Sequence, residues 1–238
     1  MTKANIRVRS VQRMAGAADS DLIELLPVRG ETPLYLPRWI LDVVTYGIVH
    51  HELIHLSGPT GSAKSSLIEA LCTVPKNFSL ICRALGFRRL PVKLYPIEMA
   101  TFETPGELYF RRSLKDGNTF DEKSDVVRAL EDASELREQC YPVIWLREMG
   151  RVYSSTVLGG LLNLMTKGPV VLPDGKQIDS PHVAWIADSN YKAETYAAHT
   201  LAVLDDSLRR RFSINLTLDY LSSQQEFSIL QCLGERLA

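Results

Sequence analysis

Cysteine is scarce in this sequence, with four among 238 residues, and no two stand in the C-x-x-C spacing of metal and redox motifs. No histidine cluster accompanies them, so a structural zinc site is not indicated. Isolated thiols of this kind are typical of proteins kept in a reducing compartment. We therefore expect buried or incidental free thiols at Cys72, Cys82, Cys140 and Cys232.

Long apolar runs are also absent. No stretch approaches the ~20 residues that a membrane-spanning helix needs. Residues 1–20 lack the continuous apolar core of a secretory signal. We therefore expect a cytoplasmic protein without a membrane partner.

The chain has no excess of charge of either sign, because its formal net charge is -1 and its pI is about 6.5. Nucleic acid and anionic membranes are therefore not indicated as partners. One local basic stretch, residues 83–93, is a candidate basic patch, although a solvated turn leading into a strand is the favoured interpretation. The hydrophobic share of 45% and charged share of 23% are those of an ordinary globular protein, and the length suits one large α/β domain.

Helical and strand-like segments alternate about five times along the chain, which is typical of a mostly parallel sheet covered by helices on both faces. Residues 1–30 are weakly patterned and are expected to form an arm with one short strand. Residues 169–178 carry Pro173-Asp174-Gly175 between β-prone arms and predict a hairpin. Helices are expected at 36–50, 64–74, 124–140, 154–168, 204–212 and from 222, and strands at 52–57, 90–99, 141–148, 182–188 and 212–220.

Two chemical motifs overlap between residues 50 and 66. The first is His51-Glu52-Leu53-Ile54-His55, the H-E-x-x-H pattern of zinc proteases. That pattern works on a helix, where residues four apart share one face and can share one ion. Here the predicted helix ends before the histidines, and the chain runs from them into a glycine-rich turn, so a zinc protease is the disfavoured alternative.

The second motif, from Gly58 to Ser65, reads G-x-x-x-x-G-K-[ST] with one departure, Ala63, where glycine is usual. A predicted strand precedes it and a predicted helix follows, which is the context that a phosphate-binding loop requires. In such a loop Lys64 reaches the β- and γ-phosphates and the Ser65 hydroxyl can ligate Mg²⁺. We expect ATP to be held by Gly58, Pro59, Thr60, Gly61, Ser62, Ala63, Lys64, Ser65 and Ser66, although a plain glycine-rich turn before a helix is the simpler alternative.

The sequence resembles the MoxR-type AAA+ ATPases over roughly residues 33–232. The resemblance lies in GPTGSAKS, VIWLREMGRV, VVLPDGKQI, VAWIADSNY and LDDSLRRRFSINLTLDY, which follow one another in the family's order. It implies a P-loop NTPase core of the AAA+ type, with a five-stranded sheet in the order 5-1-4-3-2 and a β-hairpin insertion. We expect an N-terminal arm at 1–32, the nucleotide-binding core at 33–218, and the start of a truncated helical lid at 219–238.

Three further residues match functional positions of that family. Glu148 ends an apolar strand, where a carboxylate can polarise the attacking water; the alternative is an exposed strand-end carboxylate. Asn190 can orient that water or touch the γ-phosphate; the alternative is an asparagine that caps a loop. Arg211 can reach a γ-phosphate held by a neighbouring subunit, with Arg209 and Arg210 competing for the role; the alternative is a basic helix end.

Arg147 departs from the family, which has an aspartate there to hold the water shell of Mg²⁺. Three explanations stay open: Ser65 and the nucleotide hold the metal, Asp188 replaces the missing carboxylate, or hydrolysis is lost. An arginine can also neutralise phosphate charge itself.

The resemblance implies an ATPase subunit that remodels a partner protein, works as a homo-oligomer such as a hexameric ring, and acts on a partner that carries a von Willebrand factor A domain. The alternative is a nucleotide-gated scaffold or adaptor with weak hydrolysis. The short lid and Arg147 both favour activity that depends on assembly.

Overall fold

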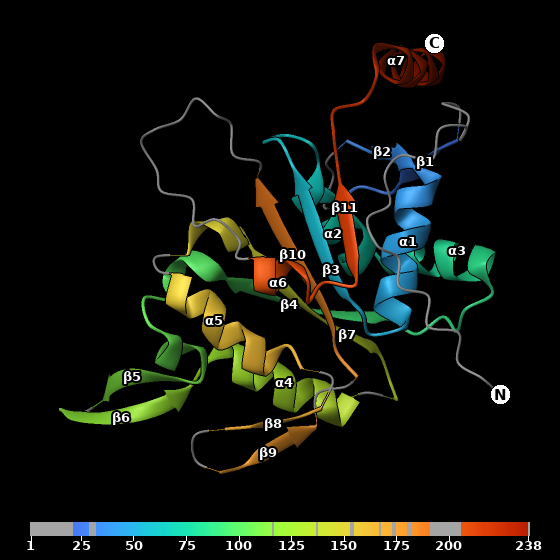
Figure 1. The fold of residues 1–238 in the computed structure, drawn as a ribbon. Coiled ribbons are helices and arrows are strands. Elements are labelled where there is room, and N and C mark those ends of the chain that lie inside the picture. Colours follow the sequence, from blue (N-terminus) through green and yellow to red (C-terminus); the bar gives the residue numbers. More distant parts are fainter. Residues whose placement is uncertain are drawn as a thin grey trace, which may run out of the picture.

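The computed structural model describes most of the chain, namely residues 21–28, 32–115, 117–136, 138–152, 155–166, 168–172, 175–179, 182–190 and 206–237. A five-stranded sheet lies at its centre (Figure 1). The strand order is β11-β3-β10-β7-β4, and every neighbouring pair is parallel. Numbered by their order in the chain, these strands read 5-1-4-3-2, so the expected order is confirmed. Their bounds are β3 Leu53–Gly58, β4 Val92–Glu98, β7 Tyr141–Arg147, β10 Ala184–Asn190 and β11 Ile214–Thr217.

Helices cover both faces of the sheet, as expected. Along β7, Val143 and Trp145 pack on one face, while Ile144 and Leu146 pack on the other. A strand buried on both faces needs a continuous apolar run, which is why this segment shows no alternation. The first face is covered by α1 Arg38–Val49, α2 Lys64–Thr73 and α3 Pro75–Leu85, and the second by α4 Asp125–Leu136 and α5 Ser155–Leu164.

The short strand expected within residues 1–30 is present. It is β1 Leu22–Leu25, which pairs antiparallel with β2 Leu34–Pro37 just before α1 begins. Asn77 of α3 secures the chain beyond β1, because its amide accepts from the Leu26 N–H at 2.9 Å and donates to the Leu26 carbonyl at 3.0 Å. The boundaries of the predicted arm, core and lid stay predictions.

Two antiparallel hairpins extend from the α4 and α5 side (Figure 1). The expected one pairs β8 Pro169–Val171 with β9 Gln177–Asp179, and the tip residues Pro173 and Asp174 lie outside the described residues. The other pairs β5 Phe110–Lys115 with β6 Asn118–Lys123 and was not predicted. Its signal was the Asp116-Gly117 dipeptide, a common hairpin turn, because the charged and polar arms on either side carry little strand propensity.

Helix α3 was also not predicted. Its buried residues Phe78, Ile81 and Cys82 recur at helical spacing, and Pro75 occupies the first turn, where proline fits a helix. The remaining elements are α6 Asp206–Arg209, α7 Ser223–Leu237 and three 3-10 turns, η1 Met99–Thr101, η2 Pro105–Leu108 and η3 Met149–Arg151. Among the described residues, no helix is both long and apolar enough to cross a membrane.

Candidate functional site

The predicted phosphate-binding loop joins β3 to α2 at the carboxyl edge of the sheet. Gly58 ends β3, and a Cβ atom there would lie 2.0 Å from the Leu218 carbonyl oxygen, so only glycine fits. Gly61 has φ +84°, in the left-handed region that glycine adopts without strain. The two glycines therefore have different roles. Gly58 allows the chain that follows β11 to approach closely, and Gly61 allows the loop to turn.

Lys64 lies folded into this loop. Its ammonium donates to the carbonyl oxygens of Pro59 at 2.7 Å and Gly58 at 3.0 Å, and to the Ser62 hydroxyl at 3.3 Å. The residue is only 6% exposed. Burial lowers the pKa of Lys64, and the nearby Asp188 carboxylate opposes that shift. The loop thus holds a cation at its centre.

The N-terminus of α2 is uncapped. Its N-cap residue is Ala63, which has no polar side chain, and no acidic residue occupies the first turn. The first N–H groups of a helix need an acceptor and carry its positive dipole end, so this terminus is suited to an anion. Ser65 and Ser66 lie in that first turn. Ala63 itself has φ +63°, a left-handed conformation that an alanine adopts only with strain.

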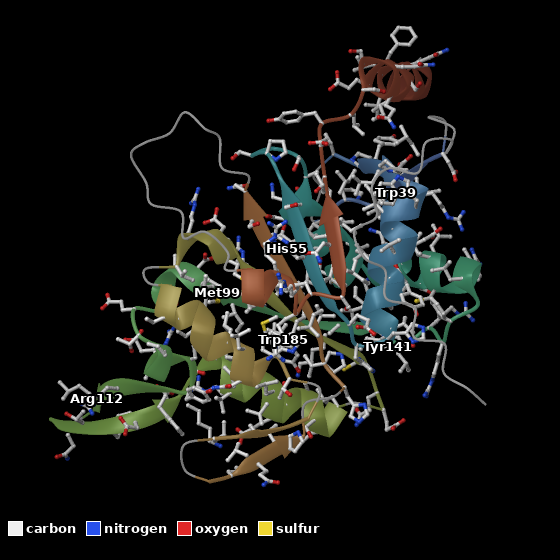
Figure 2. The ribbon with its side chains drawn as sticks, in the orientation of Figure 1. Trp39, His55, Met99, Arg112, Tyr141 and Trp185 are labelled. Carbon is white, nitrogen blue, oxygen red and sulfur yellow. The ribbon has the colours of Figure 1, made fainter. Side chains whose placement is uncertain are left out.

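The H-E-x-x-H motif does not lie on a helix. His51 and Glu52 form the turn before β3, and His55 lies within the strand. Figure 2 shows His55 among the central strands, where its Nε2 lies 2.8 Å from the Ser189 hydroxyl. Burial lowers the pKa of His55 to about 4, with a hydrogen bond to Asn215 opposing the shift and Arg209 adding to it. The described residues hold no group of three or more histidine, cysteine or acidic side chains suited to a metal, so a zinc protease site is not supported.

Asn190 and Asp188 come to this edge from β10. Asn190 is in register with Gly58, so the expected asparagine ends its strand beside the start of the loop. Asp188 is buried and accepts from the Trp145 indole N–H at 2.6 Å and the Glu148 backbone N–H at 3.4 Å. Burial raises the pKa of Asp188, while those hydrogen bonds and the charge of Lys64 oppose the shift.

Glu148 follows β7 with φ +50° and ψ +47°, again left-handed. Its carboxylate pairs with Arg151 at 2.9 Å, a contact that the sequence did not predict. Strained backbone held by surrounding structure is common at functional sites. Both non-glycine left-handed residues of this edge, Ala63 and Glu148, thus stand at predicted site positions.

Arg147 ends β7 and takes part in two contacts. Its guanidinium carbon lies 4.9 Å from the centroid of the Trp145 ring, and one guanidinium nitrogen lies 3.5 Å from the Glu98 carboxylate. A cation therefore occupies the place where the resembling family has a carboxylate.

Arg211 lies in the turn after α6, and its side chain is exposed. No hydrogen bond, ion pair or ring contact of its side chain with another described residue is recorded in the structure, and so its role in a neighbouring subunit stays a prediction. Tyr220, beyond β11, was missed by the sequence analysis: its hydroxyl donates to the Thr60 carbonyl at 2.8 Å, at the tip of the loop. No local pattern could have indicated that contact, because 160 residues separate the two.

The residues of this edge fit a polyphosphate better than they fit Mg²⁺. The uncapped helix, the glycine turn and Lys64 are together suited to an anion. Both hydrogen bonds that Asp188 accepts go to its Oδ1 atom, and Arg147 adds positive charge at the end of β7, where the resembling family has its metal-holding aspartate. The expected magnesium roles of Ser65 and Asp188 stay predictions.

No family model and no curated protein matches the sequence. Solved structures do match, among them a protein from Cytophaga hutchinsonii described as a "putative ATPase". That protein is 18% identical with a TM-score of 0.52, and the match covers 83% of this chain and 50% of that one. The chain thus spans half the length of that protein. At this identity the match shows a shared α/β fold.

Proposed function

We propose that the chain is a nucleotide-binding subunit of the AAA+ type, similar to the MoxR proteins, which binds ATP at residues 58–66. The observation that carries the proposal is the junction of β3 and α2, where a buried lysine and an uncapped helix N-terminus meet at the carboxyl edge of a parallel sheet. Nucleotides bind at this edge in open α/β sheets. The fold shared with a protein described as a "putative ATPase" supports the proposal.

Each residue of the edge then has a chemical task. When ATP binds, the Lys64 ammonium exchanges its hydrogen bonds to the carbonyls of Gly58 and Pro59 for hydrogen bonds to the β- and γ-phosphates. The N–H groups at the start of α2 face the same phosphates. Glu148 polarises the attacking water, and Asn190 positions it. Asp188 fixes the Glu148 backbone through its N–H, so it acts as a positioning residue.

Assembly is the second part of the proposal. Arg211 is exposed on the isolated chain, which suits a residue that stabilises the γ-phosphate in a neighbouring subunit. We propose a homo-oligomer such as a hexameric ring in the cytoplasm, with α7 as the first lid helix. Its protein partner, one with a von Willebrand factor A domain by the MoxR resemblance, would be remodelled as ATP turns over.

The alternative is a nucleotide-gated scaffold in which hydrolysis is weak. Two contacts favour it: Arg147 stands in place of the metal-holding aspartate, and the Glu148 carboxylate is paired with Arg151. Both hypotheses require ATP binding, and only the first requires turnover.

The test measures ATP binding and then hydrolysis at protein concentrations that allow oligomers to form. We expect Lys64→Ala to lose binding by about 100-fold or more, since it removes the central cation, whereas Lys76→Ala on the exposed part of α3 leaves binding unchanged. Steady hydrolysis that Glu148→Gln abolishes would establish the ATPase; tight binding without turnover would establish the scaffold. Failure of the wild type to bind any nucleoside triphosphate would contradict both.

A further inference from the structure

We infer that this site takes nucleoside triphosphate in its metal-free form, with the Arg147 guanidinium supplying the positive charge that Mg²⁺ supplies elsewhere. The inference rests on the proposed function and concerns the same site. It starts from a mismatch: the loop is suited to a polyphosphate, whereas the charges beside it are not suited to a dication.

The sheet places Arg147 within reach of the phosphates. Leu146 of β7 is in register with Ala187 of β10, so Arg147 and Asp188 follow side by side. Asp188 is in register with Leu56 of β3, two residues before Gly58. Neighbouring strands lie ~4.8 Å apart, so Arg147 starts about 10 Å from the loop strand. A long side chain on the sheet face that α2 covers can span most of that distance.

The guanidinium is held against an aromatic surface, although its ion-pair partner Glu98 lies on β4, on the side of β7 away from the loop. Arg147 lies over the Trp145 ring, and the Trp145 indole N–H is bonded to the buried Asp188 carboxylate. This chain of contacts holds the planar group over a fixed surface, which lowers the entropy lost when it binds. A guanidinium can donate two parallel hydrogen bonds to a phosphate, so it is a strong ligand for one.

Its present partner is easily exchanged. The ion pair with Glu98 measures 3.5 Å, and the two side chains are 42% and 41% exposed. Exposed pairs of this kind contribute little to stability, because water and salt screen them. A phosphate group, which carries more charge than a carboxylate, can therefore displace Glu98.

The charges that favour a phosphate at this edge disfavour a magnesium ion. A dication bound to the phosphates would be repelled by the Lys64 ammonium, and also by the Arg147 guanidinium once it contacts the same phosphates. The Oδ1 atom of Asp188, whose carboxylate acts electrostatically on Lys64, already accepts from Trp145 and Glu148, so Oδ2 is the one oxygen of this side chain left for a metal. Over the described ranges, no cluster of three metal-binding side chains offers a substitute.

The experiment measures the affinity for ATP by calorimetry, once in excess EDTA and once in saturating Mg²⁺. We expect the wild-type affinity to differ by less than about threefold between the two conditions, because the arginine replaces the metal. Arg147→Asp, which restores the family's residue, is expected to lose about tenfold or more in EDTA and to recover on addition of Mg²⁺. Arg147→Lys keeps the positive charge but loses the planar guanidinium that donates two parallel hydrogen bonds. Its affinity for ATP in EDTA should therefore lie between those of the wild type and Arg147→Asp.

Arg112→Asp is the matched control, since Arg112 is an exposed, ion-paired arginine on the β5–β6 hairpin, away from the sheet (Figure 2). It should behave as the wild type, and thermal unfolding checks that each variant is folded. Wild-type binding that requires Mg²⁺ and is unaffected by Arg147→Asp would overturn the inference and leave the proposed function standing. Absence of binding in both conditions would instead remove the proposed function.

Discussion

At the scale of single residues, backbone strain marks the candidate site. Ala63 and Glu148 both have positive φ, a conformation that costs a residue with a Cβ atom about 1–2 kcal/mol. Ala63 precedes the helix that is proposed to face the phosphates, and Glu148 carries the proposed catalytic carboxylate. The packing of the surrounding sheet holds both residues in place.

The strain at Ala63 predicts that Ala63→Gly stabilises the protein. Glycine adopts φ +63° without a steric penalty, so the free energy of unfolding should rise by about 1 kcal/mol, measured by urea denaturation. Ala84→Gly in α3 is the control, because an exposed helical alanine should lose up to ~1 kcal/mol on the same change. Destabilisation by both substitutions to a similar extent would show that Ala63 is not strained.

The buried His55 predicts a pH dependence of stability. Its pKa falls from 6.5 to about 4 on folding, so between these values the unfolded chain binds a proton that the folded chain does not. The free energy of unfolding is therefore highest above pH 6.5 and should fall by roughly 3 kcal/mol as the pH drops toward 4.

Comparison of variants isolates that contribution. His55→Gln should remove this part of the pH dependence, because glutamine does not titrate, whereas the exposed His50→Gln should retain it. Urea midpoints measured across this pH range provide the comparison. If the stability of His55→Gln fell with pH in parallel with that of the wild type, His55 would not be the source of the pH dependence.

At the scale of elements, the end of β3 is held against the chain that follows β11. The Leu218 N–H donates to the Ser57 carbonyl at 2.7 Å, and the Leu218 carbonyl lies against Gly58. Tyr220 then contacts the loop at Thr60. The segment between β11 and α7 thus packs directly against the predicted phosphate-binding loop.

This contact predicts that Gly58→Ala is strongly destabilising. The added methyl group would lie 2.0 Å from backbone oxygen, which cannot move without separating the two strands. We expect a loss of roughly 2–3 kcal/mol in unfolding free energy, together with weaker nucleotide binding. Gly159→Ala in α5 has open space around it and should instead stabilise by about 0.5–1 kcal/mol. Wild-type stability for Gly58→Ala would contradict the close approach.

At the scale of the whole molecule, the parallel sheet gathers β3, β7 and β10 so that their carboxyl ends meet at one edge. Lys64, Glu148 and Asn190 come together there, although 126 residues separate the first from the last. Arg211 has no recorded contact with them. We propose that a second copy of the chain supplies this arginine to the site.

Complementation tests that idea. Lys64→Ala subunits should not bind ATP but still present Arg211, and Arg211→Ala subunits should bind ATP but lack the arginine. If the arginine acts between subunits, mixing the two inactive variants should restore part of the hydrolysis, measured as phosphate release. A mixture that stays as inactive as its components, while forming mixed oligomers, would place the role of Arg211 elsewhere.

Much of the fold could be predicted because its signals are local. The apolar run before Arg147, the helical spacing before His50 and the glycine-rich turn at 58–65 each reflect the environment of one segment. Helix α3 and the β5–β6 hairpin also have local signals that were overlooked, in the spacing of Phe78 and Ile81 and in Asp116-Gly117. The resemblance to a known family then supplied the strand order, which no local pattern contains.

The sequence by itself determined which segments become strands and helices, and that a basic residue follows a glycine turn at the start of α2. Those features depend on neighbours a few residues away. Only the tertiary structure decided that Asp188 is bonded to Trp145, that Arg147 lies over that ring beside Glu98, and that Tyr220 supports the loop. Such contacts join residues 43 to 160 positions apart or depend on side-chain direction, and both are settled only when the whole sheet packs.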